Sequence, residues 1–489
     1  MSLDLFQQEK RFGSEVAIRA DGVRLSYSEV AASVGLLIHE FKAQGIEAGD
    51  RVAFIAQNSV QYVLALLALL KLEASFVPLN VRLDQAMLAR QLKTARCKLL
   101  LCDDKAEVWQ PFCTKVVNLK QFVDRVLVDA NLEAPLSEAD LELDISYGTE
   151  CGVVFTSGSS GDPKGVVFTK ENILQSALSV SKHCNYRAAH CWLLSLPLYH
   201  VGGLSILMRA ITSGGSVYVI NKLSSLEVFT AVQSGQVTHL SLVPTVLEEL
   251  IANSDNVGPL KEVQYILLGG APVSVALVKQ IQQHNLPVAT SYGMTELAST
   301  AVVSDLGCKG CLEGSTGKLL AHVKLKIIDD AGQTCRPNEH GQIVVGGASL
   351  FKGYLSENRD ELQEVGSWFK TGDIGYLREG GTLVVAGRSD RMIISGGENI
   401  HPQELEHVAS DFPGLKHVAV IAVDHAKWGQ RPILFVEPHS IDSFSSDDLS
   451  LHLAEYLPKF KRPDRIIVLS KLPLTGIGKV DYAAVRKVL

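Results

Sequence analysis

The stretch Phe155-Thr156-Ser157-Gly158-Ser159-Ser160-Gly161-Asp162-Pro163-Lys164-Gly165 follows a short apolar run, GVVF at residues 152–155. Glycine lets a backbone approach a ligand closely and turn several N–H groups toward it, hydroxyl groups add hydrogen-bond donors, and lysine adds a compact positive charge. This composition is typical of a loop that binds a polyphosphate. It is not a Walker loop, because proline stands at position 163, where G-x-x-x-x-G-K-[ST] requires glycine. The alternative is an ordinary surface turn.

Further segments along the chain combine glycine, hydroxyl and charged residues. They are LPLYH (196–200), GGAP (269–272), SYGMTE (291–296), GSTG (314–317), WFKTGD (368–373), GRSD (387–390), SGGEN (395–399) and PLTGIGK (473–479). With the loop at 155–165 they resemble, in kind and in order, the motifs of the adenylate-forming superfamily, which includes acyl-CoA synthetases, luciferases and peptide-synthetase adenylation domains. The resemblance implies that the enzyme activates a carboxylic acid with ATP as an acyl-AMP and then transfers the acyl group to a thiol.

The composition agrees with a soluble globular protein of more than one domain. Of 489 residues, 46% are hydrophobic and 20% are charged, and a net charge of −7 argues against a broad nucleic-acid-binding surface. The N-terminus lacks the pattern of a signal peptide, and the longest apolar run, residues 62–70, is too short to span a bilayer. Nine scattered cysteines suit a reducing compartment. We therefore expect a cytoplasmic protein without a transmembrane segment or a nucleic-acid partner.

Apolar runs rich in β-branched residues alternate with helical patterns. A strand is expected over residues 52–55 before a helix over 59–71, and another over 263–268 before a helix over 273–284. This alternation predicts an α/β fold with mostly parallel sheets and helices on both faces. In such folds ligands lie at loops beyond the carboxyl ends of strands.

A domain boundary is expected near Arg388. Beyond a strand at 382–386, the pattern predicts strands at 391–395, 416–423 and 465–469, helices at 402–410 and 446–457, and a short helix at the end. That is a compact α+β module of ordinary domain size. We therefore expect an N-terminal AMP-binding and acyl-substrate domain over residues 1–388 and a small mobile lid domain over residues 389–489.

The resemblance implies that most site residues bind ATP. The residues expected to contact it are Thr156, Ser157, Gly158, Ser159, Ser160, Gly161, Lys164, Gly270, Ala271, Pro272, Ser291, Tyr292, Gly293, Met294, Thr295, Asp373 and Arg388. In the family, the first loop holds the β- and γ-phosphates, the segment at 291–295 lies beside adenine and the α-phosphate, and an aspartate and an arginine contact the ribose. A core Tyr292 and a turn-capping Asp373 are the alternatives.

The catalytic set implied by the resemblance is Lys479, His200, Thr156, Lys164 and Glu296. Glu296 is expected to bind Mg²⁺, for which a carboxylate oxygen is a suitable ligand. His200 is expected to face the substrate carboxylate, as a donor or as a gate for the thiol. Lys479 is expected to bridge that carboxylate and the α-phosphate. A solvated glutamate, a structural histidine and a solvated lysine are the alternatives.

The residues expected to serve the second half-reaction, the transfer to the thiol, follow the domain boundary near Arg388. By resemblance, Gly396 and Gly397 line a tunnel for the pantetheine arm of coenzyme A, and Asp390 is the hinge about which the lid rotates. The segment at 196–205 and the chain length favour a small aromatic acid with two carboxylates as the substrate, with Arg209 as a candidate partner for the second carboxylate. A short- or medium-chain or aryl acyl-CoA synthetase, an enzyme that loads a carrier protein, and a nucleotide-binding protein without activity stay open, as does a homodimer.

Overall fold

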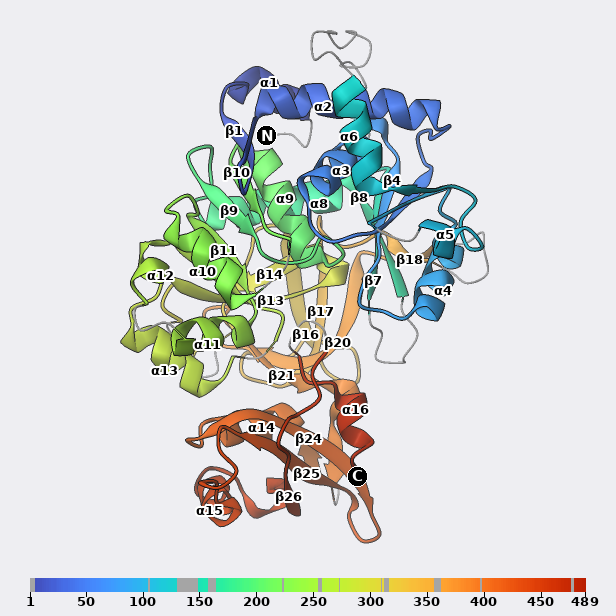
Figure 1. Ribbon diagram of the computed structural model, residues 1–489. Coiled ribbons are helices and arrows are strands. Elements are labelled where there is room, and N and C mark those ends of the chain that lie inside the picture. The colour runs from blue at the N-terminus through green and yellow to red at the C-terminus, as the bar shows by residue number, and fades with distance from the viewer. Residues whose placement is uncertain are drawn as a thin grey trace.

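The computed structural model describes residues 5–103, 106–129, 148–156, 164–221, 224–253, 257–271, 273–308, 310–311, 316–355, 362–395, 398–475 and 479–489. These residues form two lobes (Figure 1). The larger lobe contains three β-sheets with their helices, and the smaller, at the bottom of the view, contains a fourth sheet. The predicted α/β class is confirmed.

The first sheet has nine strands in the order β15-β14-β13-β12-β11-β9-β10-β1-β2. They are β1 (Val16–Ala20), β2 (Val23–Ser26), β9 (Cys191–Leu194), β10 (Ser216–Val219), β11 (His239–Leu242), β12 (Tyr265–Leu268), β13 (Val288–Met294), β14 (Ser299–Val303) and β15 (Lys318–Leu319). The strands from β13 to β1 pair in parallel, and β2, β14 and β15 extend the sheet as antiparallel strands. Strands such as β12 are buried along their whole length, as expected for parallel strands covered by helices.

The second sheet has eight strands in the order β19-β18-β8-β7-β4-β3-β5-β6. They are β3 (Arg51–Ile55), β4 (Ser75–Pro78), β5 (Leu99–Cys102), β6 (Val116–Asn118), β7 (Glu150–Thr156), β8 (Lys164–Thr169), β18 (Gly353–Leu355) and β19 (Leu362–Glu364). Its parallel half runs from β7 to β6, while β8, β18 and β19 are antiparallel additions. The strand expected over residues 52–55 is β3.

Helices cover both sheets and fill the space between them (Figure 1). They are α1 (Leu5–Phe12), α2 (Tyr27–Ala43), α3 (Val60–Leu72), α4 (Gln85–Ala95), α5 (Ala106–Trp109), α6 (Leu119–Asp129), α8 (Lys170–His183), α9 (Val201–Ser213), α10 (Ser225–Gln233), α11 (Pro244–Asn253), α12 (Gly258–Glu262) and α13 (Val275–Gln283). Helices α8 and α9 pack on each other, and α8 contacts strands of both sheets. The main hydrophobic core therefore joins the two sheets into one unit.

Helix α3 explains the longest apolar run of the sequence. The Ser59 hydroxyl accepts a hydrogen bond from the N–H of Tyr62 at 3.1 Å and caps the first turn. The chain leaves the helix at Glu73, whose φ of 61° is left-handed. All residues from Tyr62 to Leu72 are buried, so the predicted helix over 59–71 is confirmed as a core helix.

A third sheet was not expected from the sequence. It has the order β16-β17-β20-β21, with β16 (Val323–Ile328), β17 (Gly341–Gly347), β20 (Trp368–Leu377) and β21 (Leu383–Arg388). All its pairs are antiparallel. Antiparallel strands need no crossover helix, so the alternation of strand and helix that indicates a parallel sheet is missing from this segment. The expectation of mostly parallel sheets therefore holds for the two large sheets only.

The small lobe contains the predicted α+β elements and two further strands, β23 and β25. Its elements are η3 (Ser389–Arg391), β22 (Ile393–Ser395), β23 (Glu398–Ile400), α14 (Pro402–Ser410), β24 (Leu415–His425), β25 (Gly429–Pro438), α15 (Ser446–Tyr456), η4 (Lys459–Lys461), β26 (Arg465–Val468) and α16 (Tyr482–Arg486). Helix α14 has the predicted bounds. Strand β25 was missed, although β22, β24 and β26 all pair with it. Pro432 argues against a strand in the sequence, because proline has no N–H to donate to the hydrogen bonds between strands.

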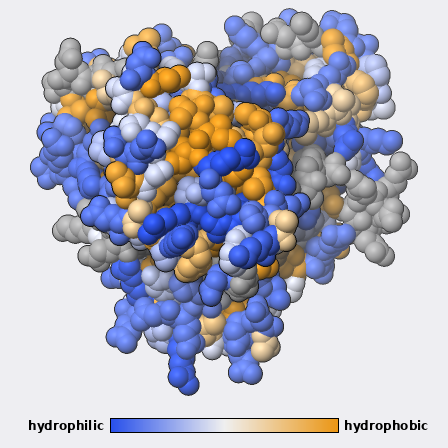
Figure 2. Space-filling view, turned by 90° about the horizontal axis from the view of Figure 1, so that it is seen from below, coloured by the Kyte–Doolittle hydropathy of each residue, from blue (hydrophilic) through white to orange (hydrophobic). Residues whose placement is uncertain are grey.

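The surface on the side of the small lobe is mostly polar, with a hydrophobic patch near the middle of the view (Figure 2). The exposed large apolar side chains of this lobe are Ile394, Trp428, Ile441, Leu451, Tyr456, Phe460, Val488 and Leu489. Within the ranges described, no helix has both the length and the hydropathy that crossing a bilayer requires.

Candidate active site

The two ends of the predicted phosphate loop lie opposite each other at the tip of a hairpin. Strands β7 and β8 are antiparallel, and Thr156 pairs with Lys164 in their register. The Thr156 hydroxyl donates to the carbonyl oxygen of Lys164 at 3.4 Å. The intervening residues, including the predicted ligands Ser157, Gly158, Ser159, Ser160 and Gly161, lie outside the described part of the chain.

Glu296 lies in a single turn, η1 (Thr295–Leu297), directly after β13. The preceding Gly293 allows β14 to approach closely, because a Cβ there would come within 1.9 Å of the Ser299 carbonyl oxygen. The Glu296 residue is 8% exposed, and its Oε1 accepts a hydrogen bond from the Tyr354 hydroxyl at 2.6 Å. The described residues contain no cluster of three metal-binding side chains. An ion at Glu296 therefore needs further oxygen ligands from elsewhere, and phosphates supply such oxygens.

Tyr354 was not selected from the sequence. Besides its bond to Glu296, its ring lies 5.3 Å from the Lys164 ammonium, measured to the ring centroid. Tyr354 and Glu296 are 58 residues apart in sequence. No local signal in the GYL of β18 indicates a partner at that distance.

The predicted ribose motif forms a hydrogen-bonded group at the junction of β20 and β21. Asp373 Oδ2 accepts from the Tyr292 hydroxyl at 2.5 Å, and Asp373 Oδ1 accepts from Arg388 Nη1 at 3.3 Å. Burial raises the pKa of Asp373, while Tyr292 and Arg388 favour its ionised form. Gly372 has a φ of +77°, and a Cβ there would meet Arg388 Nη2 at 3.1 Å. The pairing of β20 with β21, in which Asp373 lies opposite Arg388, thus brings arginine and aspartate together.

The predicted adenine-side turn follows β12. Gly270 has a φ of +86°, which favours glycine, and a Cβ on Gly269 would lie 2.3 Å from Ser291 Oγ. Ala271 and Ser291 are half-buried beside this turn, and Met294 and Thr295 follow at the end of β13. Pro272 lies outside the described residues. The turn and the Tyr292 segment therefore lie side by side at the carboxyl ends of neighbouring parallel strands.

Lys479 of the small lobe reaches this edge of the large lobe. Its Cε lies 3.9 Å from the position that a Cβ on Gly270 would occupy. The residue is solvent-accessible, and partial desolvation of its amine lowers the pKa of that amine below its ordinary value. The segment around residue 479 is thus brought from the far end of the chain to the adenine-side turn.

His200 is the residue before α9. Burial, then the nearby Lys479 and Arg82 charges, lower the pKa of His200 to about 4, so its imidazole is neutral at pH 7. Its Nε2 is buried and has no hydrogen-bond partner among the described residues. A buried polar atom without a partner indicates that a ligand or water supplies one.

Arg209 is a buried cation two turns further along α9. Its residue is 1% exposed, Nη2 donates to Ser205 Oγ at 3.0 Å, and the guanidinium lies 4.6 Å from the Trp192 ring centroid. Its Nε and Nη1 have no hydrogen-bond partner in the described parts of the chain. Burial lowers the pKa of Arg209 to about 10, and the groups that oppose this effect, Cys184 first, include no carboxylate.

The predicted hinge residue Asp390 lies in η3, directly after β21. Its Oδ1 and Oδ2 accept from Arg388 Nε and Nη2 at 3.3 and 3.1 Å. Arg388 thus contacts both the ribose motif and the hinge. Gly396 and Gly397, predicted to line the thiol tunnel, lie outside the described residues.

Comparison with known families gives two matches that together cover most of the chain. A model described as AMP-binding enzyme matches residues 5–355, and one described as AMP-binding enzyme C-terminal domain matches residues 404–479.

Curated relatives and solved structures resemble the chain over nearly its whole length. A 2-succinylbenzoate–CoA ligase of Listeria monocytogenes is 34% identical over 96% of this chain and 95% of its own, and one of Bacillus subtilis is 31% identical over 97% and 96%. The o-succinylbenzoate CoA synthetase of Bacillus subtilis in complex with its acyl-adenylate intermediate superposes with a TM-score of 0.87 at 30% identity, covering 98% of this chain and 97% of that one. The same enzyme with ATP and magnesium gives 0.85 at 29% identity, covering 97% of both chains.

Proposed function

The chain belongs to the AMP-binding enzyme family, and on that premise we propose that it joins 2-succinylbenzoate to coenzyme A at the expense of ATP. The first step forms an acyl-adenylate: a carboxylate oxygen attacks the α-phosphorus and pyrophosphate leaves. In the second step the CoA sulfur attacks the carbonyl carbon and AMP leaves. The first step brings an anion to a polyanion, so charge neutralisation and positioning carry most of the catalysis.

The site residues described above divide this work among three sheets and the small lobe. The ribose hydroxyls would bind Asp373, whose carboxylate has two acceptor oxygens, and Arg388 would hold that carboxylate in place. Lys479 would bridge the substrate carboxylate and the α-phosphate. His200, neutral at pH 7, would offer an N–H to the substrate. Mg²⁺ at Glu296 would neutralise charge on the phosphates. We place this reaction in the cytoplasm, because all nine cysteines are free thiols.

The observation that carries the choice of acid is the buried guanidinium of Arg209 without a carboxylate partner. A buried charge is stable only when it is paired or hydrogen-bonded. Nine residues of helix separate it from His200, a rise of about 13 Å, and helical side chains point back toward the N-terminus. The bond to Ser205 Oγ places Arg209 Nη2 beside a residue only five positions from His200, and we infer that an aromatic acid with two carboxylates spans the space between them.

ATP–pyrophosphate exchange with a panel of acids, followed by CoA-ester formation, tests the proposal. We expect 2-succinylbenzoate to give the highest kcat/KM among 2-succinylbenzoate, benzoate, octanoate and malonate. A higher kcat/KM for benzoate or octanoate would favour an aryl or medium-chain synthetase instead. Exchange with 2-succinylbenzoate but no thioester with CoA would favour a carrier-protein acceptor.

Arg209→Met should raise the KM for 2-succinylbenzoate about thirtyfold, because a hydrogen bond to a charged group contributes about 1.5–3 kcal/mol. The KM for ATP should change less than about twofold. Removing an unpaired buried charge should not lower the thermal unfolding temperature. Arg187→Met, on an exposed arginine, is the matched control. An unchanged KM for the acid would place the second carboxylate elsewhere.

Glu296→Gln should lower kcat/KM for MgATP about fiftyfold, about 2.3 kcal/mol of barrier. Glutamine keeps the volume and an acceptor for Tyr354 but loses the charge that a divalent cation needs. Steady-state exchange at several magnesium concentrations measures the effect, with Glu339→Gln on the exposed surface as the control. Kinetics like those of the wild type at low magnesium would remove Glu296 from the metal site.

A further inference from the structure

Tyr354 contacts two of the proposed ATP-binding groups through different parts of one side chain. Its hydroxyl donates to Glu296 Oε1 at 2.6 Å, and its ring centroid lies 5.3 Å from Lys164 Nζ. The first contact is a hydrogen bond to a charged acceptor, the stronger kind, and the second is within the range of a cation–π interaction. One residue therefore joins the proposed magnesium ligand to the lysine at the end of the phosphate loop.

The register of the second sheet produces this arrangement. Strand β18 pairs with β8 in an antiparallel register that places Tyr354 opposite Val166. Lys164 precedes Val166 by two residues, so its side chain leaves the same face of the sheet. Diagonal neighbours in such a pair are within reach of aromatic and long side chains. The contact to Lys164 therefore follows from strand pairing and does not depend on the loop at 157–163.

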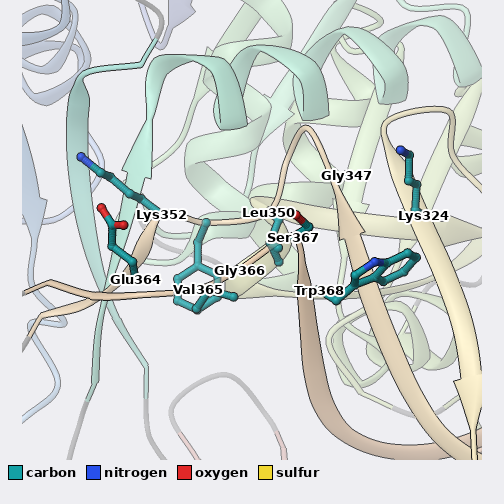
Figure 3. Close-up of a pocket in the computed structure, with 10 residues that line it drawn as sticks. Lys324, Gly347, Leu350, Lys352, Glu364, Val365, Gly366, Ser367 and Trp368 are labelled. Atoms are coloured by element: carbon teal, nitrogen blue, oxygen red, sulfur yellow. The ribbon is translucent and has the colours of Figure 1, made fainter. Parts of the chain in front are cut away.

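An aromatic cluster fixes the orientation of the Tyr354 ring. Phe351 packs edge-on against Tyr354 at a centroid distance of 4.7 Å, and Phe369 packs against Phe351 at 5.3 Å. The N–H of Phe351 also donates to the carbonyl oxygen of Glu296 at 2.9 Å. Phe351 contributes to the wall of an open groove of about 510 Å³, whose labelled residues Leu350, Val365 and Trp368 appear in Figure 3. Phe351 therefore contacts the groove, the Tyr354 ring and the backbone of Glu296.

The hydroxyl of Tyr354 occupies one of the two oxygens of the Glu296 carboxylate, because it donates to Oε1 at 2.6 Å. Because Oε1 of Glu296 accepts this hydrogen bond, Oε2 is the oxygen that remains for a metal ion. A carboxylate held at one oxygen presents the other in a defined direction, which lowers the entropy lost when a ligand binds.

We propose that Tyr354 is a positioning residue for the metal–triphosphate end of the nucleotide site. Its hydroxyl holds Glu296 Oε1, so that Oε2 would be the oxygen available to Mg²⁺, and its ring contacts Lys164, which would bind the same phosphates. This role rests on the proposed function only through the binding of MgATP, not through the identity of the acid.

Two substitutions separate the two contacts. Tyr354→Phe keeps the ring and removes the hydroxyl, so the magnesium concentration at half-maximal ATP–pyrophosphate exchange should rise about tenfold, about 1.4 kcal/mol, while the KM for ATP at saturating magnesium stays within twofold. Tyr354→Leu also removes the ring face, so the KM for ATP should rise at least about fivefold even at saturating magnesium. Calorimetric titration of ATP at several magnesium concentrations, without any acid, should show the same two patterns.

Tyr376→Phe is the matched control, because Tyr376 is a half-buried tyrosine of β20 and packs against His340. It should leave both the magnesium and the ATP dependence unchanged. An unchanged magnesium midpoint in Tyr354→Phe, with wild-type activity intact, would overturn the positioning role alone. A parallel loss of kcat and of unfolding temperature, independent of magnesium, would overturn it too. Wild-type protein that binds MgATP but makes no thioester from 2-succinylbenzoate would contradict only the proposed function.

Discussion

Lys479→Ala is expected to lower the rate of acyl-adenylate formation by at least about a thousandfold, about 4 kcal/mol of barrier. In the observed arrangement of the lobes, Lys479 lies beside Gly270 and close enough to His200 to lower the pKa of that imidazole. Alanine removes the charge that would stabilise the transition state where two anions meet.

The conversion of supplied acyl-adenylate with CoA should stay within about threefold of the wild type in Lys479→Ala, because that step needs no charge between carboxylate and phosphate. Rapid-quench measurement of each half-reaction separates the two effects. Lys471→Ala, on an exposed lysine of the same lobe, is the control. Equal losses in both half-reactions by a folded Lys479→Ala protein would contradict the assignment of Lys479 to the first step.

Local pattern was sufficient for much of the fold. Strand-then-helix alternation predicted the parallel parts of the two large sheets, and the uniformly apolar run at α3 predicted a core helix. Local pattern failed where pairing is set by topology. In the antiparallel third sheet, β17 pairs with β20 although two strands of another sheet lie between them in the chain. Strand β25 contains Pro432, which argues against a strand when the sequence is considered alone.

For the site, the sequence motifs predicted which residues take part but not which residues they contact. Thr156, Gly270, Tyr292, Asp373 and Lys479 all follow from resemblance. Arg388 holds Asp373 through the pairing of β20 with β21, and Tyr292 holds it through a side-chain contact between residues 81 positions apart. The role of Tyr354 follows from a register between β8 and β18 that no local pattern indicates. Distant partners of this kind are what a single sequence leaves undetermined.

The hinge is connected to the nucleotide site through Arg388. Its guanidinium bonds to Asp373 on one side and to Asp390 on the other. A second contact between the lobes is the ion pair of Lys279 on α13 with Asp411 after α14, at 2.7 Å. Both residues of that pair are partly exposed, so it contributes little to stability. We propose that a rotation about Asp390 would break this exposed pair at little cost in free energy.

Asp390→Pro should lower the rate of CoA-ester formation by at least about a hundredfold, about 2.7 kcal/mol of barrier, with acyl-adenylate formation within about fivefold of the wild type. Asp390 lies in the 3₁₀ turn Ser389–Arg391. The φ of such turns, about −50 to −70°, includes the value of about −65° that proline imposes. The arrangement with Lys479 beside Gly270 therefore stays accessible, whereas a rotated backbone at residue 390 does not.

Two comparisons isolate the effect of the fixed dihedral in Asp390→Pro. Asp390→Ala also loses the pair with Arg388 but leaves φ free, so it should keep both half-reactions within about threefold. Proline also disfavours the helical backbone of the residue before it, Ser389, and thermal unfolding measures that strain. The test compares the rate of pyrophosphate exchange, which reports acyl-adenylate formation, with the rate of overall thioester formation in each variant. A fixed φ at the true hinge should slow one half-reaction and spare the other. Small and equal losses in both assays would therefore place the pivot at another residue.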